Sequence, residues 1–214
     1  MEEIRLSCID CAVKACMTPD NEENYPKFCQ TREITDEVRQ EVIELYQSDE
    51  ENAMVMKAAA EVEMMGKMTR VEETMEFAKR IGAKKIGIVT CIGVLSEARM
   101  LGKIFRTQGF EVYGVSCKCG AIRKKAIGLD QKTEKMGIMT CDPILQARRM
   151  DEENVDLIVT IGLCVGHDAI FYKYAKGLVT TLFTKDKITV HNAVAPLHGT
   201  EAYYSYLLKK PKDK

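Results

Sequence analysis

Nine cysteines are the residues of this 214-residue chain most able to do chemistry, and four of them lie close together near the N-terminus. Their spacing is Cys8-x2-Cys11-x4-Cys16-x12-Cys29. Because the intervening segments are short, four thiolates can converge there on one metal centre. A tetrahedral zinc ion and an iron–sulfur cluster both accept four thiolates, so the spacing leaves the metal open. A redox dithiol at Cys8 and Cys11 fits less well, because this CxxC pair lacks the strand before it and the helix after it.

The remaining cysteines lie farther apart, and they follow short apolar runs. Cys91 follows IGIVT, Cys117 and Cys119 follow VYGVS, Cys141 follows GIMT, and Cys164 follows LIVTIG. Open parallel sheets bind ligands outside the carboxyl ends of their strands, where successive loops come together. We therefore expect four separate loops to bring Cys91, Cys117, Cys141 and Cys164 into one crevice. Ligands from such distant loops favour a [4Fe–4S] cluster, because structural zinc prefers compact hooks.

Three histidines complete the set of residues that could bind a metal or move a proton. His167 lies three residues after Cys164, at the expected start of a helix. It is our candidate for a proton donor or an alternative ligand, with capping or packing as the competing interpretation. No motif surrounds His191 or His198, and we expect both to be structural.

Basic residues follow Cys117 in the sequence: Lys118, Arg123, Lys124 and Lys125. They could offset the charge of a cluster or hold a small anionic substrate, and a solvated basic helix is the alternative. Charge is also uneven along the chain, with 19 acidic and 8 basic residues in 1–76 but 13 acidic and 23 basic residues in 77–214. We interpret this as two solvated faces of opposite sign, with attraction inside one compact unit or across an oligomer as the alternative.

Composition and periodicity divide the chain into three zones. Residues 1–34 form a cysteine-rich, metal-binding segment with little apolar periodicity. Residues 35–82 form a helical segment, with helices expected to begin at Thr35, Asp49 and Thr69 and the last to end at Gly82. Residues 83–214 form an α/β domain with cysteines at the carboxyl ends of its strands.

Short apolar runs within this last zone alternate with amphipathic stretches. The runs predict strands over 86–90, 112–116, 157–161 and 179–184. The amphipathic stretches predict helices over 93–108, 143–150, 168–175 and 195–208. Residues 137–140 suit either a short strand or a loop. Such alternation indicates a three-layer α/β fold with a parallel sheet, Rossmann-like or flavodoxin-like.

Several classes of protein are disfavoured by what the sequence lacks. The net charge of −1 argues against a nucleic-acid partner. The acidic start MEEIRLSCIDC has no apolar core, so we expect no signal peptide and a cytoplasmic protein in which disulfides do not persist. The apolar stretch 157–165 is too short to cross a membrane. Neither a nucleotide-binding glycine motif nor a hydrolase motif is present.

Several longer motifs resemble one family. They are CxxCxxxxC near the N-terminus, TCIGVLSEA at 90–98, VSCKCG at 115–120, CDPILQA at 141–147 and GLCVGHDAIFYKYA at 162–175. Together they resemble the bacterial and archaeal family called domain of unknown function 1847, which is cysteine-rich and expected to bind metal. This resemblance covers nearly the whole chain and implies metal binding, with no settled activity.

Carried over to this sequence, the resemblance points to the same two sets of four cysteines as the spacing does. It implies that Cys119 is a spare thiol, because the family usually has another residue there. This chain has Asp142 where the family tends to have Asn, and Gln30 where Pro commonly follows Cys29. Neither difference removes a ligand.

Three functions are compatible with these residues. Two metal centres with full cysteine ligation favour electron transfer to a redox partner protein. A cluster with one open iron, near His167 and the lysines, favours an enzyme that handles a small anionic substrate, with a sulfur-containing molecule as one candidate. A zinc-stabilised scaffold or sensor without catalysis is the third. The sequence does not give the oligomeric state.

Overall fold

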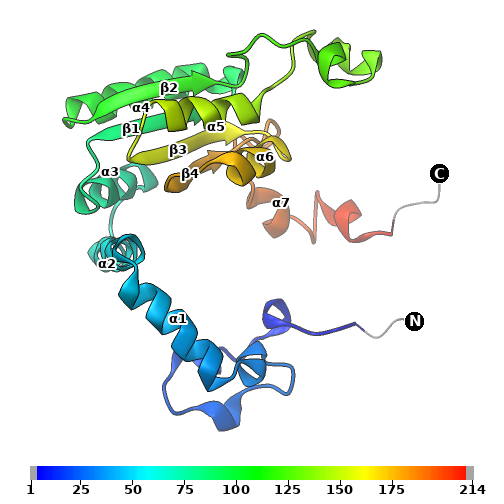
Figure 1. The fold of residues 1–214 in the computed structure, drawn as a ribbon. Helices are drawn as coiled ribbons and strands as arrows, with labels where there is room; N and C mark the ends of the chain where they lie inside the picture. The colour runs from blue at the N-terminus through cyan, green and yellow to red at the C-terminus, as the bar shows by residue number, and fades with distance from the viewer. Residues whose placement is uncertain (1–3, 211–214) are drawn as a thin grey trace. The chain divides into compact units, whose positions relative to one another are not determined.

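The computed structural model describes residues 4–210, and the chain forms two compact units whose boundary falls between Glu61 and Val62 (Figure 1). The first unit contains four short 3₁₀ turns and α1 (Asp36–Ser48), and α2 (Glu50–Met65) contains the boundary. The turns span Cys8–Asp10, Ala15–Met17, Glu22–Asn24 and Gln30–Glu33. Within residues 4–34 only Ala15 is buried, so few apolar contacts stabilise this segment.

The second unit contains a four-stranded, all-parallel sheet. Its strands are β1 (Lys85–Thr90), β2 (Glu111–Ser116), β3 (Leu157–Leu163) and β4 (Val179–Thr184), in the order β2-β1-β3-β4. This order is that of a doubly wound, flavodoxin-like sheet, and the direction of winding reverses between β1 and β3. The predicted α/β fold with a parallel sheet is therefore confirmed.

Helices cover both faces of the sheet and complete the three layers (Figure 1). On one face, α3 (Arg70–Arg80) and α4 (Leu95–Thr107) share a core with Ile86, Ile88 and Val159 of the strands. On the other, α5 (Pro143–Glu152) and α6 (His167–Tyr174) share a core with Val89 and Ile158. Successive residues of a strand point to opposite faces, so a strand buried on both sides needs the continuous apolar runs found here.

Local sequence signals fix the ends of several helices. Thr35 caps α1 by accepting a hydrogen bond from the backbone N–H of Val38. Thr69 caps α3 in a capping box, in which its hydroxyl accepts from the N–H of Glu72 and the Glu72 carboxylate accepts from the N–H of Thr69. Asp142 caps α5, which has Pro143 in its first turn.

The C-terminal part of the second unit differs from the prediction. A continuous helix over 195–208 was expected, but the structure has a single turn, α7 (Ala195–His198), and a separate 3₁₀ turn at Ser205–Leu208. Gly199 ends α7, and the N–H of Tyr204 then donates to the carbonyl of Gly199, which folds the chain back. Residues 137–140 form a loop with one isolated antiparallel bridge, Arg123 to Met139.

No helix within residues 4–210 combines the length and the apolar character needed to cross a membrane.

Candidate metal centres

Cys91 and Cys164 lie at the point where the winding of the sheet reverses. Cys91 directly follows β1 and Cys164 directly follows β3, and these neighbouring strands run parallel. Both thiols therefore emerge at the carboxyl edge of the sheet, which is where doubly wound folds place their ligands.

One long connection, from β2 to β3, supplies the next two cysteines. The chain leaves the sheet at Cys117 and comes back beside it at Cys141, and backbone hydrogen bonds join the two arms of this loop, residues 117–141. The N–H of Lys124 donates to the carbonyl of Ile138 (3.0 Å) and the N–H of Asp142 donates to the carbonyl of Cys117 (2.9 Å).

The expectation of four separate loops was thus wrong in one respect. Three connections supply the four cysteines, because GIMT before Cys141 is the returning arm of the loop 117–141 and not a strand of the sheet.

These four cysteines interact with one another. Hydrogen bonding with Cys117 lowers the pKa of Cys91 to about 5, and hydrogen bonding with Cys117 and His167 lowers the pKa of Cys141 to about 4. The same interactions with Cys141 and Cys91 raise the pKa of Cys117. Burial, followed by the nearby charge of Cys91, raises the pKa of Cys164. The four side chains therefore interact as one group.

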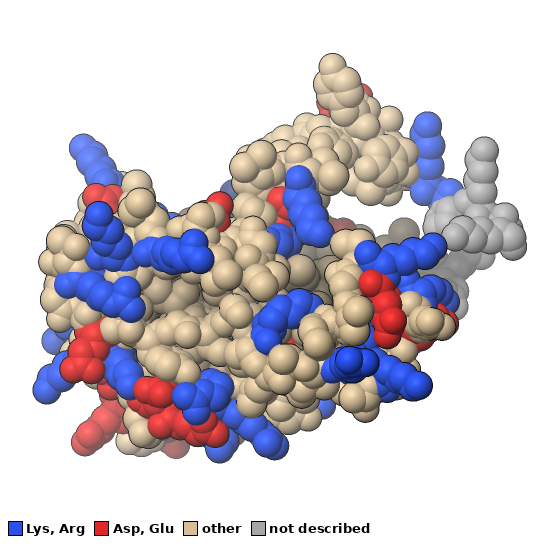
Figure 2. Space-filling model, turned by 90° about the horizontal axis from the view of Figure 1, so that it is seen from above, with Lys and Arg blue, Asp and Glu red and all other residues tan. Residues whose placement is uncertain are grey.

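A cavity of about 660 Å³ opens between these loops. Its lining includes the four thiols and six basic side chains: Lys118, Lys124, Lys185, Lys187, His167 and His191. No Asp or Glu belongs to its lining among residues 4–210. On the face drawn in Figure 2, Lys and Arg side chains are widely spread while Asp and Glu gather in a few groups. The cavity therefore combines soft thiol ligands with positive charge.

The sequence pointed to some of these side chains and not to others. Lys118, Lys124 and His167 line the cavity as proposed, whereas Arg123, Lys125 and the exposed Cys119 are outside its lining. Lys185 and Lys187 were missed, although their position directly after β4 is the same kind of signal that identified the cysteines. His191 has a structural role, since its Nδ1 accepts from the N–H of Asp186 (3.0 Å), but it lines the cavity as well.

Backbone N–H groups point at two of the sulfurs. The N–H of Ile92 donates to Sγ of Cys117 (3.4 Å) and that of Gly93 donates to Sγ of Cys91 (3.5 Å). Gly93 also leaves room for a cation, because a Cβ built on it would lie 3.1 Å from Nζ of Lys185. Donors and positive charge at thiolates stabilise the anionic form that binds metals.

The cysteines of the first unit lie on its short turns. Cys8 and Cys16 are exposed, and Cys11 and Cys29 are half-buried. The hydroxyl of Thr31 hydrogen-bonds to Cys29 and lowers the pKa of that thiol. Burial and the charge of Glu22 raise the pKa of Tyr25, and the charges of Cys16 and Cys29 contribute.

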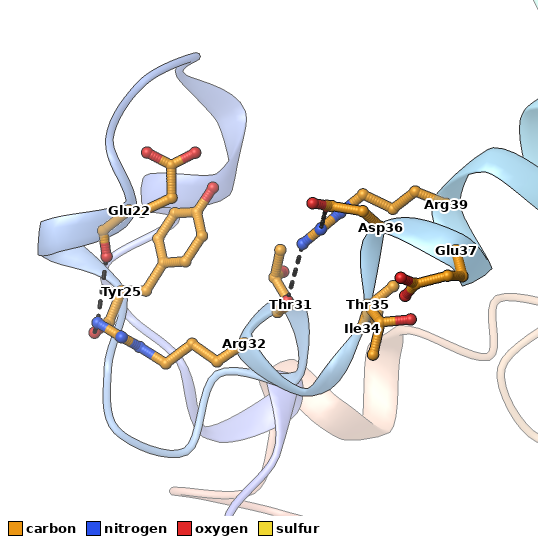
Figure 3. Close-up of a pocket in the computed structure, with 9 residues that line it drawn as sticks. All are labelled: Glu22, Tyr25, Thr31, Arg32, Ile34, Thr35, Asp36, Glu37 and Arg39. Atoms are coloured by element: carbon orange, nitrogen blue, oxygen red, sulfur yellow. Dashed lines mark hydrogen bonds and ion pairs between the residues drawn. The ribbon is translucent and has the colours of Figure 1, made fainter.

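Two arginines fix the loop that ends at Cys29 (Figure 3). Arg32 donates to the carbonyls of Glu22 (3.1 Å) and Tyr25 (2.9 Å), and Arg39 donates to the carbonyl of Thr31 (3.2 Å). These residues lie around a hollow of about 510 Å³, whose lining also includes Ile34, Thr35, Asp36 and Glu37. Arg32 thus holds the backbone before Cys29, and Arg39 of α1, which also pairs with Asp36, holds the turn after it.

No three His, Cys, Asp or Glu side chains within residues 4–210 are close enough together to hold a single metal ion. The four thiols at the sheet edge line the wall of one cavity. Four thiols are the number and kind of ligand that zinc and iron–sulfur centres both take, so the residues present suit either group.

Two comparisons with known proteins identify the family of this chain. Residues 29–182 match the family described as a protein of unknown function, DUF1847. The chain is also 38% identical over 187 residues to an uncharacterised protein of Methanocaldococcus jannaschii, covering 86% of this chain and 93% of that protein. The family match contains all four cysteines of the sheet edge and Cys29, while Cys8, Cys11 and Cys16 precede it. The predicted resemblance is confirmed, and this chain belongs to the cysteine-rich DUF1847 family.

Proposed function

We propose that the sheet-edge cavity binds a [4Fe–4S] cluster through Cys91, Cys117, Cys141 and Cys164, and that the protein acts in electron transfer. The observation that carries this proposal is the set of four interacting thiols that line one cavity. Four thiols held this close need a positive partner, because they otherwise repel when ionised or remain partly protonated.

Two further features support a cluster. The backbone donors at Ile92 and Gly93 resemble the N–H···S hydrogen bonds that tune iron–sulfur centres. The positive charges of Lys118 and Lys185 act on the thiols of Cys141 and Cys91, where they would offset the negative charge of four thiolates.

The burial of the ligands suits electron transfer. Cys91 and Cys117 are buried, whereas Cys141 and Cys164 are half-buried, and all four line the cavity. The cysteines would hold the group and the surrounding apolar side chains would limit the access of water. The bound cluster would supply a one-electron centre.

For the first unit we propose a second metal centre at Cys8, Cys11, Cys16 and Cys29, either zinc or an iron–sulfur cluster, whose binding would draw together thiols that are too far apart in this structure to hold one ion. Support comes from the small apolar core of residues 4–34, since metal ligation contributes folding free energy to segments that bury little surface.

One observation favours a second function. His167 hydrogen-bonds with Cys141, which raises the pKa of His167, and it lines the same cavity. If Cys141 were displaced, one iron would be open beside a proton donor, and the protein would be an enzyme acting on a small molecule. A change in the visible spectrum when a small molecule is added would identify this case.

The experiment is anaerobic reconstitution of the wild type, of the double variant Cys141→Ala/Cys164→Ala and of Cys119→Ala. Cys119 is the matched control, because it is an exposed cysteine outside the cavity. We expect about four fewer iron and four fewer sulfide per chain in the double variant than in the other two proteins. Equal iron, equal sulfide and the same visible spectrum in all three would refute the cluster.

A further inference from the structure

We infer that the same cavity has a binding site for a small organic dianion, such as a phosphate ester or a dicarboxylate, at Lys124 and Lys187. The inference deepens the proposed function and rests on it in one respect: the cluster takes the cysteine-lined part of the cavity, and the dianion binds beside it.

The first argument is the balance of charge. Four lysines line the cavity, whereas an oxidised cube with four thiolate ligands has a net charge of about −2. Within residues 4–210, none of these four lysines forms an ion pair with a carboxylate. Glu97 acts at longer range: a hydrogen bond with Ser96 is the main cause of its lowered pKa, and the charges of His191 and Lys185 contribute. About two positive charges therefore remain for a second anion.

The second argument is the burial of Lys124. This side chain is only 9% exposed, and its ammonium group donates to the carbonyl of Thr133. A buried ammonium without a carboxylate partner is costly, and an anionic ligand would offset that cost. Lys125, the next residue, is exposed and outside the cavity.

The third argument is the turn that positions Lys187. The Asp186 carboxylate accepts from the N–H groups of Ile188 (2.9 Å) and Thr189 (3.0 Å), and the Asp186 backbone exchanges hydrogen bonds with His191. Val190 and His191 both have positive φ, which is uncommon for residues with a Cβ and rare for a β-branched one. The turn is thus built at some conformational cost, and it presents Lys187 and His191 to the cavity.

The remaining lining indicates the body of the ligand. Leu129, Met136 and Ile92 give the cavity an apolar portion between its charged residues. A volume of about 660 Å³ lies within the range of about 300–1,000 Å³ that is usual for small-molecule sites. An apolar body with two negative charges matches this lining better than a bare inorganic ion does.

The test is calorimetric titration of the full chain at low ionic strength, because salt screens such charges. Phenyl phosphate and succinate are the dianionic probes, and acetate is the monoanionic control. We expect at least one dianion to bind at least tenfold more tightly than acetate. Lys124→Met and Lys187→Met should each weaken that binding by about tenfold or more, the usual effect of losing a charge-assisted hydrogen bond. Lys125→Met should leave it unchanged.

Iron and sulfide are counted in the same samples, so that two failures can be told apart. Normal cluster content with no dianion binding, or with binding that neither lysine variant weakens, would overturn the inference and leave the proposed function in place. Absence of a cluster from the wild type would refute the proposed function. In that case the dianion titration of the purified wild type and its lysine variants would still test the anion site by itself: loss of binding in Lys124→Met and Lys187→Met would support it, and unchanged binding would overturn it.

Discussion

Gly162 offers a test of how the backbone positions the cysteines at the sheet edge. It lies in β3, two residues before Cys164, where the pairing of β3 with β4 shifts register, and its φ is +60°. A Cβ built on it would lie 2.7 Å from a methyl group of Val94 and 3.1 Å from the ring of Phe183. Val94 is only 1% exposed, so it has little room to move.

Replacing Gly162 with Ala should therefore destabilise the protein through two effects. A left-handed residue with a Cβ costs about 1–2 kcal/mol, and overpacking a core costs about 1–3 kcal/mol. We expect a loss of about 2–5 kcal/mol in the free energy of unfolding. Val94 ends the 3₁₀ turn that begins directly after Cys91, so the clash should displace both Cys91 and Cys164 and reduce iron uptake.

Urea unfolding and iron counts after anaerobic reconstitution measure both effects. Gly114→Ala in β2 is the control, because its Cβ would lie 3.8 Å from the carbonyl of Ile88, an ordinary contact. If the Gly162 and Gly114 variants were equally stable and bound equal iron, the proposed role of this bend in β3 would be wrong.

Three other substitutions test separate parts of the account. Thr69→Ala removes the cap of α3 and should cost about 1 kcal/mol in urea unfolding, whereas an unchanged midpoint would show that the capping box adds nothing. Lys85 hydrogen-bonds to Glu153 and lowers the pKa of that carboxyl in the folded protein. The pair therefore stabilises the fold fully above the unfolded pKa of Glu, about 4.3, and this stabilisation is lost as the pH falls through the folded-state pKa of Glu153. Glu153→Gln should accordingly lower the melting temperature at pH 7 but not near pH 3, and an equal loss at both would contradict the assignment. If the proposed metal is bound in the first unit, Cys11→Ser should release it and make residues 1–34 more sensitive to protease, and the proposal fails if metal content and cleavage both match those of the wild type.

Much of the fold was predictable because its signals are local. The apolar runs that become β1, β2, β3 and β4 are bounded within two residues of their observed ends. In the central strands β1 and β3, burial on both faces demands continuous apolar sequence. The caps at Thr35 and Thr69 involve residues only three positions apart, so the starts of these helices could also be predicted from the sequence. The cysteines could be brought to one edge because parallel strands all end on the same side.

The rest depended on contacts between residues distant in sequence. Hydrogen bonds across the loop 117–141 bring Cys141 back beside Cys117. The periodicity of apolar residues does not predict such contacts. Lys187 and His191 reach the cavity through a turn in which Val190 and His191 have positive φ. Neither residue type predicts that conformation from the sequence. The predicted helix over 195–208 had helical spacing, but Gly199 and the packing of Tyr204 against it end α7 after one turn.

The most direct test of the central claim is an anomalous-difference map, recorded at the iron absorption edge, from crystals of anaerobically purified protein. We predict a peak several atoms wide between the sulfurs of Cys91, Cys117, Cys141 and Cys164, with continuous density to each. A cavity without iron density, or one that holds a single zinc ion, would contradict the proposal of a [4Fe–4S] cluster at this edge.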